Sequence, residues 1–71
     1  APPNLRTRSS GTQVKNLQKD LNNVMKSGLA VDGEFGTKTE NALKAFQKKY
    51  DLAVDGIYGE RSRLKMKSLL R

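Results

Sequence analysis

Apolar residues in the first third of the chain recur with the spacing of one face of a helix. Their steps of three and four residues match the 3.6-residue period of an amphipathic helix. The members of this stripe are Val14, Leu17, Leu21 and Val24. Just before it, residues 10–13 read Ser-Gly-Thr-Gln, which matches a capping box for the first free N–H groups. The pattern predicts a helix over about residues 11–26. Gly28 is expected to take the left-handed conformation that ends it.

Two further helices are predicted by the same reasoning. One begins at Thr37, where residues 37–40 (Thr-Lys-Thr-Glu) form a second capping box, and it ends at Asp51. Its inward positions are Leu43, Phe46 and Tyr50, with Ala42 and Ala45 allowing close approach. The third helix begins near Glu60, whose carboxylate suits the positive end of a helix dipole. It is expected to turn Met66, Leu69 and Leu70 inward and Arg61, Arg63, Lys65 and Lys67 mostly outward.

The segments between the predicted helices are copies of each other. Residues 29–36 read LAVDGEFG and residues 52–59 read LAVDGIYG, so six of eight positions are identical. Such internal repetition indicates one structural unit used twice. Asp can accept bonds from the N–H groups just ahead of it, and Gly accepts a positive φ. We therefore expect two structured Asp-Gly loops, whose structural residues are Gly33, Phe35, Gly36, Gly56 and Gly59.

A glutamine at the edge of each apolar stripe is expected to brace the loop that follows. Shifting the first helix by 29 residues places Leu17-Gln18 on Phe46-Gln47. A Gln side chain there can bond the turn amides while its stem packs against the core. The third helix has Leu69-Leu70 in the corresponding place. That helix has no third loop to brace, which agrees with a structural role for Gln18 and Gln47.

Composition bounds the possible chemistry. The chain has 71 residues, 35% of them hydrophobic, with a net charge of +7, which fits one small folded domain. It contains neither Cys nor His, so a disulfide, the usual zinc, haem and iron–sulfur sites and a His-based nucleophile are excluded. No apolar run approaches the ~20 residues of a membrane span. We interpret residues 1–9, with Pro2-Pro3, as a linker to an N-terminal catalytic domain. Within this linker, Leu5 is expected to dock on the domain formed by residues 10–71.

Together these residues resemble the type 1 peptidoglycan-binding domain of bacterial and phage cell-wall hydrolases. The resemblance covers about residues 10–70. It departs from the family pattern at Asp51, where the family often has Gly, and at Lys65, which stands at the counterpart of Ala42. At Ser62 a hydroxyl residue is kept, but Ser replaces the Thr of the family. The matching positions are Gly11, Val14, Leu17, Gln18 and Leu21, then 31–36, Thr39, Ala42, Leu43, Phe46 and Gln47, then Leu52, Asp55, Gly56, Gly59 and Ser62.

The resemblance implies an all-α, compact three-helix domain that binds peptidoglycan and does no chemistry itself. It implies a monomer without cofactor or metal, attached to a lytic enzyme such as an autolysin or endolysin. It also implies an extracellular location at the bacterial wall, or release of the protein by phage-mediated lysis. The glycan, the stem peptide and the cross-link all remain open as the bound part.

The candidate binding surface is the loop side, where polar residues of the two repeats are expected to meet. It comprises Asp32, Glu34, Asp55 and Tyr58, with Gln47 and Lys48 nearby. A purely structural interpretation is favoured for the two Asp residues, which would cap their own turns. For Phe35 a place in the core is favoured over stacking on a ligand, whereas Tyr58, with its O–H group, is about evenly balanced.

Three other functions are weighed against wall binding. A structural module that docks on its own catalytic partner is the first alternative. Metalloprotease pro-domains of similar fold inhibit their enzymes through a Cys that binds the catalytic zinc, and this chain has no Cys. A nucleic-acid-binding helix around Arg61 to Lys67 is less favoured, because no helix-turn-helix pattern appears. A glycosidase using Asp32 and Asp55 is weaker still, since so small a domain offers little room for a cleft.

Overall fold

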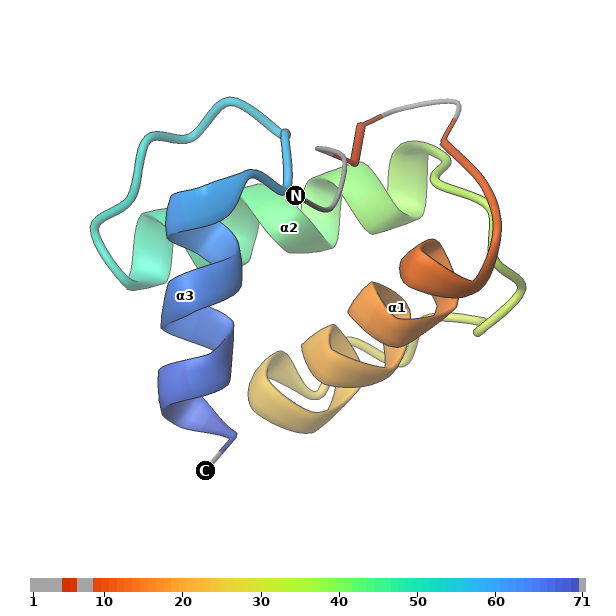
Figure 1. Ribbon diagram of the computed structural model, residues 1–71, viewed down its shortest axis with the longest axis horizontal. Helices are drawn as coiled ribbons and strands as arrows, with labels where there is room; N and C mark the ends of the chain where they lie inside the picture. Colours follow the sequence, from red (N-terminus) through yellow and green to blue (C-terminus); the bar gives the residue numbers. More distant parts are fainter. Residues whose placement is uncertain (1–4, 7–8, 71) are drawn as a thin grey trace.

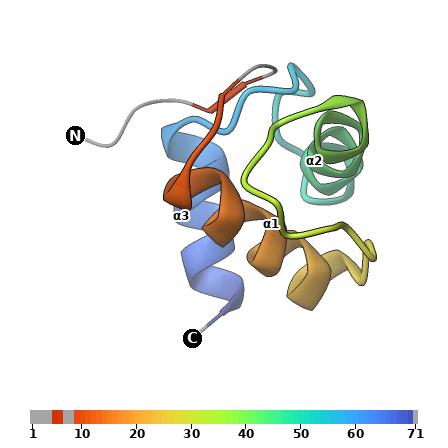
Figure 2. The same ribbon diagram turned by 90° about the vertical axis from the view of Figure 1, so that its right-hand side faces the viewer.

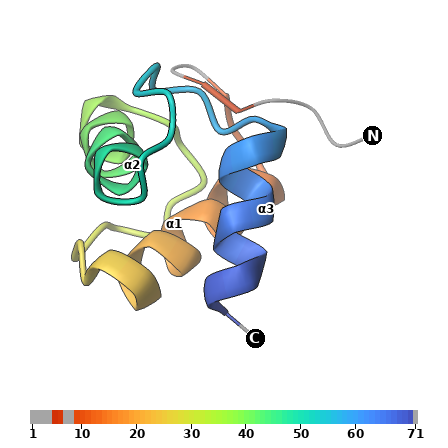
Figure 3. The same cartoon turned by 90° about the vertical axis from the view of Figure 1, so that its left-hand side faces the viewer.

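The computed structural model describes residues 5–6 and 9–70 and contains three helices. These are α1 (Thr12–Met25), α2 (Thr37–Lys49) and α3 (Glu60–Leu69). Their axes run in three different directions, and Figures 2 and 3 show α2 nearly end-on while α1 and α3 cross its direction (Figure 1). Within the described residues the only β structure is two isolated bridges. The predicted all-α, three-helix fold is therefore confirmed, with extents of 27 × 25 × 22 Å.

The core draws on all three helices and on both repeated loops. The predicted stripes of α1 and α2 supply most of it, because their apolar side chains fall on the faces that meet. The loops add one aromatic ring each, and α3 adds a single methionine. The buried apolar residues are Leu5, Val14, Leu17, Leu21, Phe35, Leu43, Phe46, Tyr58 and Met66.

The last turn of α3 differs from its prediction. Met66 is buried, but Leu69 and Leu70 are 36% and 42% exposed, so the expectation that both point inward was wrong. Leu69 is the last residue of α3 and Leu70 is its C-cap, and Leu70 lies at the edge of a cavity that it shares with residues of α1.

Glycine residues, and not capping boxes, begin all three helices. The N-cap positions are Gly11, Gly36 and Gly59, and none carries a side-chain cap bond. The boxes predicted at Ser10 and Thr37 were therefore wrong. Ser10 instead pairs with Glu34 in a β-bridge. Thr37 already lies inside α2, because the Glu40 N–H donates to the Gly36 carbonyl at 3.0 Å.

The first helix also ends one step earlier than predicted. Lys26, with φ 53°, takes the left-handed conformation at the end of α1. Gly28 has φ 68° but lies beyond that residue, inside the connection. The predicted stop signal was thus assigned to the wrong residue, although a left-handed cap is present.

The N-terminal segment packs across both loops. Leu5 is buried, and its N–H and carbonyl bond the Tyr58 carbonyl and N–H at 3.2 and 2.7 Å. Further along, the Phe35 N–H donates to the Ser9 carbonyl at 3.0 Å. The expected docking of Leu5 is confirmed. The division into a linker and a domain stays a prediction, and Pro2-Pro3 lies outside the described residues.

Candidate functional site

The loop of residues 29–36, here called the Gln18 loop, is held by one buried side chain of α1. The Gly33 N–H donates to Gln18 Oε1 at 3.0 Å. In return, Gln18 Nε2 donates to Asp32 Oδ1 and to the Glu34 carbonyl, both at 3.0 Å. It also contacts the Thr39 hydroxyl at 3.1 Å in the first turns of α2. One amide therefore joins α1, the loop and α2.

The loop of residues 52–59, the Gln47 loop, repeats this arrangement one helix later. The Gly56 N–H donates to Gln47 Oε1 at 3.1 Å. Gln47 Nε2 then donates to Asp55 Oδ1 at 2.9 Å and to the Ile57 carbonyl at 3.0 Å. The hydroxyl of Ser62, in α3, lies 3.2 Å from the same nitrogen. The departure from Thr to Ser at residue 62 thus keeps the hydroxyl that the contact uses.

Hydrogen bonds lower the pKa of both loop aspartates. For Asp32 the main cause is the Glu34 N–H, followed by the Gln18 amide. For Asp55 the main cause is the Ile57 N–H, with a further contribution from Gln47. These bonds favour the charged carboxylate. Each Asp therefore has a structural task within its own turn, as the structural interpretation requires.

The predicted binding residues do not all line the same cavity. Asp32 and Glu34 line a shallow hollow of about 230 Å³ at the start of α2, together with Lys38. Tyr58 lines a different and larger cavity. Gln47 is only 1% exposed, and the bonds to its loop occupy its amide. Its contact with a ligand stays a prediction.

Two of the remaining candidates lie on the surface of the protein. Lys48 is exposed on α2, and Asp55 is exposed in the Gln47 loop. Neither lines the larger cavity. Their role in binding stays a prediction.

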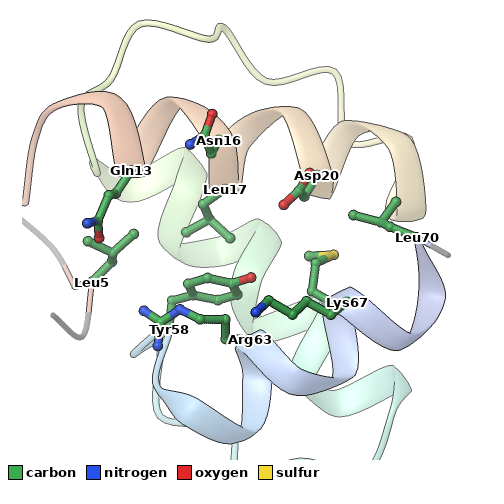
Figure 4. A pocket seen from close by; sticks show the side chains of 10 residues that line it. Leu5, Gln13, Asn16, Leu17, Asp20, Tyr58, Arg63, Lys67 and Leu70 are labelled. Atoms are coloured by element: carbon green, nitrogen blue, oxygen red, sulfur yellow. The ribbon is translucent and has the colours of Figure 1, made fainter. Parts of the chain in front are cut away.

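The larger cavity is an open groove of about 560 Å³ between α1, α3 and the N-terminal segment (Figure 4). We call it the α1–α3 groove. Its floor is apolar, formed by Leu17, Met66 and Leu5, with the Tyr58 ring beside them. Its rim is polar and charged. The rim residues are Gln13, Asn16 and Asp20 on α1 and Arg63 and Lys67 on α3, with Leu70 at one end.

The charges on the two walls have opposite signs. Partial burial raises the pKa of Asp20 on the α1 wall. On the α3 wall, the Arg63 guanidinium lies 5.2 Å from the centre of the Tyr58 ring, a cation–π contact that orients it. Burial, together with the negative charge of Asp20, raises the pKa of Tyr58 to about 12, so its hydroxyl stays protonated at neutral pH.

Sequence reasoning missed five of the residues that line this groove. Gln13, Asn16 and Asp20 follow one another at i, i+3 and i+7, next to the apolar stripe. Arg63 and Lys67 are four apart, hence on one face of α3. Each set has helical spacing that marks a shared face. Nothing in the sequence alone indicated that the two faces line the same groove.

The described residues contain no group of three or more acidic side chains placed to hold a metal ion. None of their helices is long and apolar enough to cross a membrane.

Comparison with known proteins identifies the family. The profile of the peptidoglycan binding domain matches residues 10–66, most of the chain and all three helices apart from the end of α3. The chain therefore belongs to the family of peptidoglycan binding domains. Peptidoglycan is the partner that this membership supports, and the cell wall is the corresponding place of action.

Three individual similarities agree with the family. The structure of the SleB N-terminal domain matches 100% of this chain and 97% of its own, with a TM-score of 0.94 and 31% identity. A probable N-acetylmuramoyl-L-alanine amidase of Bacillus licheniformis is 54% identical over 41 residues, which is 58% of this chain. The zinc D-Ala-D-Ala carboxypeptidase of Streptomyces albus G is 45% identical over 53 residues, or 72% of this chain.

The two enzymes are much longer than the region they share with this chain. The match covers 12% of the amidase and 21% of the carboxypeptidase. The chain therefore corresponds to only a small part of each of these enzymes.

Proposed function

We propose that this domain is a non-catalytic targeting module, which holds an attached cell-wall hydrolase on peptidoglycan. The observation that carries the proposal is the family match over residues 10–66. The similar proteins include an amidase and a carboxypeptidase that contain such a module as a small part of their length. Tethering raises the wall concentration that a catalytic domain meets, so cutting becomes effectively intramolecular.

The absence of catalysis in the module is part of the proposal. Paired carboxylates would be needed for glycoside cleavage, and Asp32 and Asp55 are the symmetric pair. Both accept hydrogen bonds from their own turn and from a buried Gln, which keeps them charged and fixed in place. Their geometry supports a scaffold better than a general acid, which needs a raised pKa.

The remaining features of the proposal concern context. Residues 1–9 connect the module to an N-terminal catalytic domain, and residues 10–71 act as a monomer. The module works outside the cell at the bacterial wall, or after release by phage-mediated lysis. The net charge of +7 suits this place, because teichoic acids and peptide carboxylates are anionic.

Sedimentation with purified, teichoic-acid-free peptidoglycan tests the function. We expect the isolated domain to co-sediment at both low and high salt, because a shaped site persists when free charges are screened. Cellulose serves as the control polymer. Retention at low salt alone would mean that net charge does the binding, and no retention would refute the targeting role. Release of soluble fragments from the wall would refute the non-catalytic part.

A further inference from the structure

We propose that the α1–α3 groove is the subsite for the peptide part of peptidoglycan, taking a short peptide segment that carries a free carboxylate and a free amine. This inference rests on the wall-binding function proposed above and assigns it a surface and a ligand chemistry. The groove differs from the loop surface that the sequence indicated, since only Tyr58 belongs to both.

The charges of the groove match such a ligand. Arg63 and Lys67 stand four residues apart on α3, so both cations face the groove from one wall (Figure 4). A guanidinium and an ammonium on one wall suit a carboxylate, which they bind through charge-assisted hydrogen bonds. Asp20 faces them from α1 and suits the amine of the same ligand.

The two walls leave space for a charged guest. Among the described residues, Asp20 forms no hydrogen bond or ion pair with a neighbour, although both cations line the same groove. Its carboxylate is already partly desolvated, which raises its pKa. A partly desolvated charge gains more from an opposite charge than one in bulk water. A ligand amine placed between the walls would supply that charge.

The uncharged polar groups suit a peptide backbone. Gln13 and Asn16 present amide groups along the α1 rim, each with a donor and an acceptor. The Tyr58 hydroxyl points into the groove (Figure 4), and no hydrogen bond joins it to another described residue. It is a further donor for a peptide carbonyl.

The aromatic residue of the groove argues against a sugar ring as the main guest. Stacking on a sugar needs an exposed aromatic face. Tyr58 is only 6% exposed, and the Arg63 guanidinium lies over its ring. The groove therefore offers charges and amides, which match a peptide better than the mostly uncharged hydroxyls of a glycan.

Two probes made from the same wall preparation test the inference. Complete amidase digestion of purified peptidoglycan separates free stem peptides from glycan strands that carry none, and the hydrolysed amide bond leaves an N-terminal amine on each peptide and a carboxylate on each muramic acid. Each fraction is titrated into the 15N-labelled domain. We expect the peptides to shift the amide signals of α1 around Asn16 and Asp20 and of α3 around Arg63 and Lys67. The glycan strands should leave these signals unchanged.

A matched pair of variants locates the site. Lys67→Glu and Lys38→Glu change the net charge equally at exposed residues, but Lys67 lines the α1–α3 groove and Lys38 lines the shallow hollow beside Asp32. We expect Lys67→Glu to weaken peptide binding by about tenfold. Lys38→Glu should change it by less than about twofold. Unchanged far-UV dichroism shows that each variant is folded.

The role of Asp20 is tested through the ligand. Acetylating the amines of the free stem peptide, including the N-terminal amine that the amidase creates, should weaken binding to the wild-type domain. The same acetylation should make no difference for Asp20→Asn, since the two changes remove one shared contact. Equal loss in both proteins would overturn the assignment of Asp20.

The outcomes separate this inference from the general function. Retention on intact peptidoglycan, combined with shifts at residues 32–38 or with shifts caused by the glycan strands, would overturn the peptide subsite and leave wall binding in place. Failure to be retained on intact peptidoglycan would refute the targeting function itself.

Discussion

The two repeated loops have the same internal bonds but different surroundings. In each, a buried Gln from the preceding helix accepts from the loop Gly, donates to the loop Asp and reaches a hydroxyl of the next helix. The corresponding glycines, Gly33 and Gly56, have φ of 77° and 70°. The two loops therefore have the same set of hydrogen bonds to their bracing glutamines.

The positions at which the loops differ determine what each can do. Phe35 is 2% exposed, whereas Tyr58 at the same place in the second repeat turns its hydroxyl toward the α1–α3 groove (Figure 4). The surroundings of the glycines differ as well. A Cβ on Gly33 would lie 3.2 Å from the Gly11 carbonyl oxygen and equally close to the Lys15 side chain, whereas the nearest atoms to a Cβ on Gly56 belong to the side chains of Lys44, at 3.0 Å, and Glu40, at 3.2 Å. The residues that both copies share build the loops, and the exchanged residue Tyr58 makes the second loop part of the α1–α3 groove.

Replacing the bracing glutamines should have the largest effect. We expect Gln18→Leu and Gln47→Leu each to lower the free energy of unfolding by about 3 kcal/mol, because each leaves a buried Gly N–H and a buried hydroxyl without partners. Urea denaturation measures the loss. Gln13→Leu, an exposed residue of α1, should change stability by less than about 0.5 kcal/mol. Losses that differ by more than about 1 kcal/mol between the two loops would contradict their equivalence.

The loop glycines should distinguish the two surroundings. Both alanine variants force a side chain into a positive φ, which costs about 1 kcal/mol. Gly33→Ala also presses its Cβ on backbone at 3.2 Å, so we expect about 2 kcal/mol in total for it. Gly56→Ala should stay near about 1 kcal/mol, because flexible side chains can move aside. Thermal unfolding of both variants checks the order, and a larger loss at Gly56 would contradict it.

Exchanging the aromatic residues should separate stability from binding. Phe35→Tyr places a hydroxyl in the buried site of Phe35, and we expect a loss of about 1–2 kcal/mol in unfolding free energy. Tyr58→Phe removes a hydroxyl that bonds no described residue, so stability should change by less than about 1 kcal/mol. The same variant should bind the free stem peptides more weakly. A Tyr58→Phe domain with unaltered peptide affinity would show that the hydroxyl takes no part.

The smallest effect should appear only in acid. The pKa values of Asp32 and Asp55 are lowered below 3.8 in the folded protein. Because a lowered pKa favours the charged form in the folded state, its stabilisation is present above pH 3.8 and is lost as the pH falls through the folded values. The double variant Asp32→Asn/Asp55→Asn should therefore lose less stability than the wild type on acidification. Melting temperatures measured down to about pH 2 test this, and parallel curves would contradict the assignment.

Much of the fold could be predicted because it is local or repeated. The stripe of α1 and the inward positions of α2 follow helical periodicity, so Leu17, Leu21, Leu43 and Phe46 were placed correctly in the core. The bracing bonds of Gln18 and Gln47 followed from the position of an amide at the edge of each stripe. The exact first residue of each helix could not be predicted in this way. Ser10 and Thr37 are of residue types that often cap helices, but Ser10 pairs with Glu34 in a β-bridge, and the Gly36 carbonyl accepts the first hydrogen bond of α2.

The sequence by itself determined the three helices, the two copies of the loop and, through the family pattern, the wall-binding class. Those features depend on short-range spacing and on repetition, both of which can be read along the chain. Only the tertiary structure decided that the N-terminal segment pairs with the Gln47 loop, that Leu69 and Leu70 stay exposed, and that α1 and α3 enclose a groove of opposite charges. Such features depend on how helix axes cross, and crossing is set by the packing of whole side-chain surfaces and not by any single spacing.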